Sequence, residues 1–287
     1  MKTILYVLAF VQLAFLSGSF AANANATKAD ANATKQAVPD LAAVKQYVKA
    51  VQEIEKNRNG KTPDWAAIDA QYELTLPVVK DIDVKCKTHY AEELRDAMKK
   101  CGSGEKIAVN GQIIGKGFQH VTVLAIRQQL DLMAKASPAG EKASTEQIAA
   151  YFEVIRPTLA RRDKGFFEGK KTLEAAADAA LEQLSKAKAG NLLTASRELE
   201  DAIARTYALS MLYEFEEIEK LRDSDLATCD VKRVEAGMFY RIIQQRIEKH
   251  SPKTNEILLN TINGSYGVMN SQEVEKYLAA GLGIKLR

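Results

Sequence analysis

Proline and glycine are scarce in this sequence, at 6 and 16 of its 287 residues. Because both residues interrupt helices, their scarcity leaves long stretches over which a helix can continue. Histidine is scarcer still, and none of the three histidines has a second one at the spacing of a zinc-hydrolase motif. The sequence also lacks a nucleophile elbow, a phosphate-binding loop and a dinucleotide-binding glycine fingerprint. These absences favour a protein that is not an enzyme.

Neither sign of charge dominates the chain. Its 40 Lys and Arg residues face 37 Asp and Glu residues, for a formal net charge of +3, and neither sign forms long blocks. A nucleic-acid-binding domain carries a clustered basic face instead. The composition therefore argues against a nucleic acid partner.

The first 24 residues have the pattern of a secretory signal peptide. Lys2 gives a basic start, residues 4–16 form an apolar run broken only by Gln12, and small residues follow up to Ala24. A membrane-spanning helix needs about 20 apolar residues, so this run is short for one. We expect cleavage after Ala24 or Ala26, a periplasmic, secreted or cell-surface location, and no transmembrane segment in the mature protein.

Residues 25–38 are mostly Ala, Asn, Thr and Lys without apolar periodicity, which predicts a disordered linker. Asn-x-Ser/Thr triplets begin at Asn25, Asn32 and Asn263 and would be glycan acceptors in a eukaryotic secretory pathway. Such triplets also arise by chance. Bacterial and eukaryotic export therefore both stay open.

Three cysteines, Cys86, Cys101 and Cys229, stand in a chain that we expect in an oxidising compartment. Three cysteines can form one disulfide and leave one free thiol. We predict that the disulfide joins Cys86 and Cys101 across a short local loop. The alternative is that all three thiols are free. Their spacings match no familiar zinc or haem motif.

Apolar residues recur at intervals of three and four over residues 39–287, which predicts an all-α fold. We expect an up-and-down bundle of eight to ten helices, with 39–137 and 138–287 as candidate halves. Asp40 and Asp64 are the expected N-caps of the first two helices, and a third is expected to start near Val78. Only at residues 106–116 does a small β-hairpin compete with a helix, because Asn-Gly between β-branched residues is a turn signal.

One segment, residues 201–215, is apolar or aromatic around most of a helix circumference. This pattern predicts a helix that other helices surround. Glu200, Tyr207 and Glu214 recur every seven residues along it, and Glu217 follows one turn later, so these side chains should share one face.

A carboxylate buried on this helix requires a partner. For Glu214 the candidates are an arginine of a neighbouring helix, such as Arg233 or Arg241, or a metal ion held by oxygen ligands. Ordinary ion pairing of a solvated acidic face is the competing interpretation. His120, at the start of an apolar segment, is the histidine most suited to a functional role, although lone histidines are more often structural.

The segment from Lys232 to Ile243, KRVEAGMFYRII, resembles a motif of the algal iron-assimilatory, low-iron-inducible periplasmic protein family and its bacterial relatives. In that family a Glu-Gly pair lies shortly before an aromatic residue, an arginine and an apolar residue. Here Ala236 separates Glu235 from Gly237.

The preceding acidic helix is also similar to that family, whose members carry acidic motifs proposed as iron ligands. The similar residues here are Tyr207, Tyr213 and the pairs Glu214/Glu217 and Glu216/Glu219. The resemblance covers about the last third of the mature chain. It implies an extracytoplasmic helical protein concerned with iron binding or uptake.

Our leading hypothesis is an extracytoplasmic metal-binding protein that captures iron between helices, for uptake or storage, without catalysis. Ferric iron suits carboxylate and phenolate ligands, and a small anion is a candidate additional ligand. The predicted metal ligands are Glu214, Glu217, Tyr207, Glu235 and His120. The alternative is a helical scaffold or adaptor that binds another envelope protein.

Overall fold

The computed structural model describes residues 39–135, 138–186 and 191–287. Within these ranges the chain forms ten α-helices, one short 3-10 helix and no strand, which confirms the all-α prediction. The expected signal peptide and linker, residues 1–38, lie outside the described residues. The helices are α1 Leu41–Arg58, α2 Trp65–Cys86, α3 Tyr90–Gly102, α4 Ile107–Met133, α5 Pro138–Phe166, α6 Thr172–Lys186, α7 Leu192–Leu221, α8 Leu226–His250, α9 Pro252–Asn263, η1 Tyr266–Val268 and α10 Ser271–Leu282.

Short polar side chains start several of these helices. The Asp40 carboxylate accepts a hydrogen bond from the Ala43 backbone N–H at 2.8 Å, and Asp64 accepts one from Ala67 at 3.0 Å. Each bond satisfies one of the backbone donors that a helix N-terminus leaves free. Both predicted N-caps are therefore confirmed.

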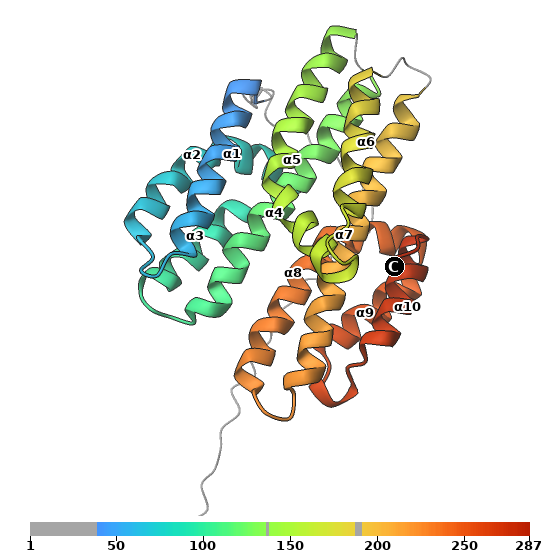
Figure 1. Cartoon of the computed structure of the whole chain (residues 1–287). Helices are drawn as coiled ribbons and strands as arrows, with labels where there is room; N and C mark the ends of the chain where they lie inside the picture. Colours follow the sequence, from blue (N-terminus) through green and yellow to red (C-terminus); the bar gives the residue numbers. More distant parts are fainter. Residues whose placement is uncertain (1–38, 136–137, 187–190) are drawn as a thin grey trace, which may run out of the picture. The chain divides into compact units, whose positions relative to one another are not determined.

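Helices that follow one another in sequence pack together, as α1 does on α2, α4 on α5, and α7 on both α6 and α8. Figure 1 shows α4 beside α5, and α6 beside α7. Residues 37–287 form one compact unit. Contacts cross the candidate division at residue 138, because α5 packs on α1 as well as on α6 and α7, and α4 packs on α8.

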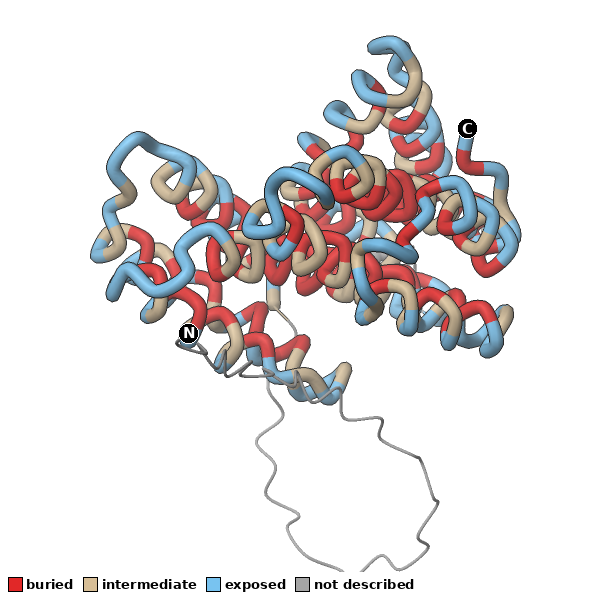
Figure 2. The backbone as a smooth tube through the Cα atoms, turned by 90° about the horizontal axis from the view of Figure 1, so that it is seen from below, coloured by how far each residue is buried: buried red, intermediate tan, exposed pale blue. Residues whose placement is uncertain are grey.

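Buried residues follow the inner faces of the helices (Figure 2). At one point Phe118 of α4 packs edge-on against both Tyr47 of α1 and Tyr72 of α2, with ring centroids 6.4 Å apart in each pair. The Tyr47 hydroxyl lies 2.8 Å from the Thr122 hydroxyl, so its polar end is satisfied. Among the described helices, none has the length and apolar content needed to cross a membrane.

The hairpin alternative for residues 106–116 is wrong, because α4 begins at Ile107 and continues through this segment. The Asn110 side-chain amide donates to the Glu105 backbone carbonyl at 2.8 Å. A Cβ atom on Gly115 would lie 2.7 Å from the Glu55 carboxylate of α1. Close packing of α1 on a glycine-bearing helix therefore outweighs the local turn preference.

The expected start of a new helix near Val78 is also wrong, because α2 runs unbroken past Pro77 to Cys86. A proline inside a helix removes one backbone hydrogen bond. Val78 and Val79 directly after it are almost fully buried. We attribute the continuity of α2 to this burial.

The predicted Cys86–Cys101 disulfide is wrong, since all three cysteines are free. Cys86 ends α2, whereas Cys101 lies at the far end of α3. The helical rise places these two ends roughly 15 Å or more apart, and a disulfide requires Cα atoms within about 7 Å.

Reduction should therefore leave the thermal stability of the purified chain unchanged. A native disulfide closing this loop would contribute about 3 kcal/mol, which would shift the melting temperature by several degrees. Melting curves with and without dithiothreitol, together with a thiol titration, check this. A drop in melting temperature on reduction of wild type, absent in C86S, would contradict the structure.

Candidate functional site

Tyr207 lies on the enclosed side of α7. Its side chain is fully buried, and its ring packs against Phe239 of α8 with centroids 6.0 Å apart. The Tyr207 hydroxyl has no hydrogen-bond partner among the described residues. Burial raises the pKa of Tyr207 above its ordinary value, so the phenol keeps its proton at neutral pH.

Glu214 of α7 and Glu235 of α8 come together around one lysine. The Lys232 ammonium lies 2.8 Å from a Glu214 carboxylate oxygen and 4.0 Å from a Glu235 oxygen. A second ammonium, that of Lys116 on α4, lies 3.0 Å from the other Glu235 oxygen. Three helices thus contribute to one buried group of alternating charges.

Burial controls the protonation of this group. It raises the pKa of Glu214 to about 7, helped by repulsion from Glu235 and opposed by Lys232 and Arg162. Burial likewise lowers the pKa of Lys116, while the attraction of Glu235 opposes that change. An ammonium group therefore compensates each carboxylate. From the sequence alone, either an arginine or a metal ion was expected to compensate Glu214.

The other acidic residues of α7 separate from this pair. Glu217 pairs with Lys220 of its own helix at 2.7 Å, and Glu216 pairs with Arg287 at 2.9 Å. The Glu219 carboxylate accepts a hydrogen bond from the Ser271 backbone at 2.9 Å. Each of these carboxylates therefore has a partner other than the lysines beside Glu214 and Glu235.

The two arginines proposed as partners of Glu214 pair elsewhere. Arg233 lies 2.9 Å from Asp230, and Arg241 lies 2.7 Å from Glu93 of α3. Lys232, the neighbour of Arg233, compensates Glu214 instead.

His120 of α4 belongs to a different site. Its Nδ1 forms a hydrogen bond with the Tyr90 hydroxyl, and its side chain is 8% exposed. Within the described ranges, no group of three or more His, Cys, Asp or Glu residues is arranged to hold a metal ion. The structure thus joins Glu214 and Glu235 but not the full predicted ligand set, and iron binding stays a prediction.

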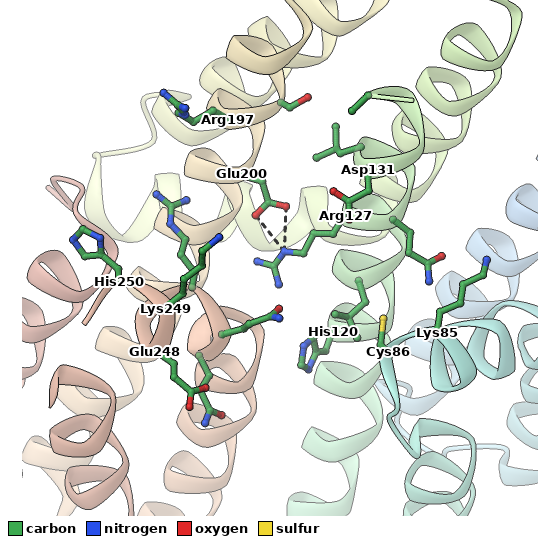
Figure 3. A pocket seen from close by; sticks show the side chains of 18 of the residues that line it. Lys85, Cys86, His120, Arg127, Asp131, Arg197, Glu200, Glu248, Lys249 and His250 are labelled. Carbon is green, nitrogen blue, oxygen red and sulfur yellow. Dashed lines mark hydrogen bonds and ion pairs between the residues drawn. The ribbon is translucent and has the colours of Figure 1, made fainter. Parts of the chain in front are cut away.

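His120 lines a groove of about 1420 Å³ between the side chains of α2, α4, α7 and α8. Figure 3 shows His120 and Arg127 extending from α4 towards α7 and α8. Arg127 Nε lies 3.1 Å from a Glu200 carboxylate oxygen, and Arg127 Nη1 donates to the Ile242 backbone carbonyl at 3.0 Å. These contacts hold the guanidinium in a fixed position in the lining of the groove.

The lining is rich in hydrogen-bond donors. Burial and the nearby charges of Arg241 and Arg127 lower the pKa of His120 well below its ordinary value, so its ring is neutral at pH 7. The neutral ring shares a hydrogen bond with the Tyr90 hydroxyl at Nδ1. Two guanidinium groups and a neutral imidazole therefore line the same groove.

Cations outnumber carboxylates among the side chains that line the groove, by six Lys and Arg to three Asp and Glu. Four of these cations form ion pairs, but only Glu200, the partner of Arg127, itself lines the groove. A ligand would therefore meet a mainly basic surface whose balancing charges lie behind it. The charged lining residues are Lys85, Arg127, Asp131, Arg197, Glu200, Arg241, Arg246, Glu248 and Lys249.

Sequence reasoning identified His120 but not Arg127 or Arg241 as binding residues. A signal for this groove is present in α4, since His120, Arg127 and Asp131 recur at helical spacing on one face. The convergence of Arg241 from α8 depends on tertiary packing, which spacing alone does not predict.

Comparison with protein-family models, with curated proteins and with solved structures finds no match.

The raised pKa of Glu214 predicts how stability changes with pH. Between pH of about 4.5 and 7 the unfolded chain loses this proton while the folded chain keeps it, so folding stability should fall as pH rises. E214Q should remove this part of the pH dependence, a change in the free energy of unfolding on the order of 1–3 kcal/mol. Urea unfolding followed by circular dichroism at pH 5 and 7.5 measures it.

The matched control is E217Q, which alters a carboxylate at the same helix on the partly exposed side. Its slope should equal that of wild type. Equal slopes for E214Q and wild type would show that Glu214 titrates normally.

Proposed function

We propose that the chain is an extracytoplasmic, non-catalytic capture protein that binds a carboxylate-rich ferric complex in the groove between α4, α7 and α8. The observation that carries the proposal is that Arg127, Arg241 and the neutral ring of His120 line one groove. The signal-peptide pattern supports the location. The family resemblance of residues 232–243 supports iron as the cargo.

The lining of the groove has the chemistry that carboxylate groups require. Guanidinium groups donate planar, charge-assisted hydrogen bonds to carboxylates. The contacts of Arg127 with Glu200 and the Ile242 carbonyl orient its guanidinium before a ligand arrives. Preorganisation of this kind lowers the entropic cost of binding.

A ferric complex fits this protein better than a bare ferric ion. Glu214 and Glu235 are the two predicted metal ligands that the structure brings together. Ammonium groups already lie 2.8 and 3.0 Å from their carboxylates. A bare ion would have to displace both Lys232 and Lys116 from a buried environment. A ferric hydroxycarboxylate complex supplies its own oxygen ligands and presents a net negative charge to the groove.

Calorimetric titration of the chain from residue 25 onwards with ferric citrate tests the proposal. Ferric citrate should bind, and gallium citrate should bind similarly because the protein contacts the carboxylates. The R127Q/R241Q double variant should lose at least about tenfold in affinity, since each substitution removes a charged donor. R156Q, whose arginine pairs with Asp178 on the surface, is the matched control and should bind as wild type.

The sequence-predicted ligand set makes the opposite prediction. If Glu214 and Glu235 are iron ligands, the E214Q/E235Q double variant loses iron while R127Q/R241Q keeps it. That outcome would overturn the groove proposal and return the iron to the carboxylates of α7 and α8.

A scaffold or adaptor that binds an envelope protein is the second candidate. The observation that favours it is Leu193, which lines the groove and is 72% exposed. If the chain is a scaffold, a purified envelope protein should form a stoichiometric complex with it, and L193D should disrupt that complex. The same sample should bind no ferric complex. Ferric citrate binding that L193D leaves intact would count against it.

A further inference from the structure

A second basic cluster lies apart from the groove, between α4, α5, α7 and α8. None of its residues lines the groove. We call it the inner cluster, and it consists of Lys116, Arg161, Arg162 and Lys232 with the carboxylates Glu214 and Glu235.

The charges of the inner cluster do not balance. Lys116 and Lys232 are matched by Glu235 and Glu214, at 3.0 and 2.8 Å. Within the described part of the chain, the side chains of Arg161 and Arg162 form no ion pair, and Arg161 Nη2 donates a hydrogen bond to the Thr158 hydroxyl at 3.1 Å. The cluster therefore holds a surplus of positive charge.

Arg162 carries the most costly part of this surplus. Its Nε and Nη1 atoms are buried and have no hydrogen-bond partner among the described residues. Burial lowers the pKa of Arg162, and the adjacent charge of Arg161 acts in the same direction. A buried donor without an acceptor is unfavourable, and a buried charge more so.

The neighbours of Arg162 do not supply an acceptor. Its guanidinium carbon lies 4.4 Å from the centroid of the Tyr213 ring, and the Lys232 ammonium lies 5.5 Å from the same centroid. Contact with the face of a ring stabilises a cation but leaves the in-plane N–H groups without a partner. Glu214 attracts Arg162 electrostatically, yet its hydrogen bond goes to Lys232.

We infer that the inner cluster binds a small inorganic oxyanion, such as phosphate or sulfate, at the unpartnered N–H edge of Arg162. An oxyanion presents several acceptor oxygens, which match the planar donor edge of a guanidinium. Arg161, the neighbour of Arg162 on α5, is exposed to solvent. This site is independent of the groove and of its proposed ferric ligand.

Inorganic phosphate is the probe, added at constant ionic strength with chloride as the balancing ion. The melting temperature of wild type should rise with phosphate concentration, as mass action requires for a ligand of the folded state. R162Q, which removes the charge and two of the unpartnered donors, should abolish the rise. R127Q/R241Q should keep it, because those arginines lie in the groove.

Folding of the variant is checked independently. Without phosphate, R162Q should show the same helical circular dichroism as wild type and a melting temperature at least as high, since an uncompensated buried charge has been removed. Broadening of the phosphorus-31 signal by wild type, lost in R162Q, measures binding directly. A phosphate response that is equal in R162Q and wild type, or absent in both, would overturn the inference.

Discussion

The buried ion pair between Lys116 of α4 and Glu235 of α8 joins the two helices that carry His120, Arg127 and Arg241. Its atoms lie 3.0 Å apart, and both residues are less than a tenth exposed. Removing one partner of such a pair leaves an uncompensated buried charge, which costs about 3–5 kcal/mol. His120 and Arg127 follow Lys116 along α4, and Arg241 follows Glu235 along α8. The relative position of these two helices therefore sets the geometry of the groove and of the inner cluster together.

The same pairing decides which chemistry the interior can perform. Glu214 and Glu235 are oxygen ligands of the kind that ferric iron prefers, but ammonium groups occupy the positions beside them. The proton retained by Tyr207 reduces its value as a phenolate ligand. Cationic side chains outnumber carboxylates both in the groove lining and in the inner cluster, which favours anionic ligands over bare cations.

Local patterns predicted much of this fold, and contacts distant in sequence account for the failures. Asp40 and Asp64 cap helices as expected, because capping depends only on neighbouring residues. Asn110-Gly111 failed as a turn because α1 packs closely on that part of α4. Glu214 was correctly expected to need a buried partner, but its choice of Lys232 over Arg233 or Arg241 depends on helix rotation. The spacing of residues along α4 predicts part of the groove lining, whereas Arg241 joins this lining only through tertiary packing.

Visible absorbance during a ferric citrate titration tests the central claim most directly. If the groove takes the intact complex, iron should co-elute with the protein while no phenolate-to-iron charge-transfer band appears, because Tyr207 stays buried and protonated. A charge-transfer band that grows with bound iron and disappears in Y207F would contradict the account. Iron would then be bound by protein ligands beside Glu214 and Glu235, with the lysines displaced.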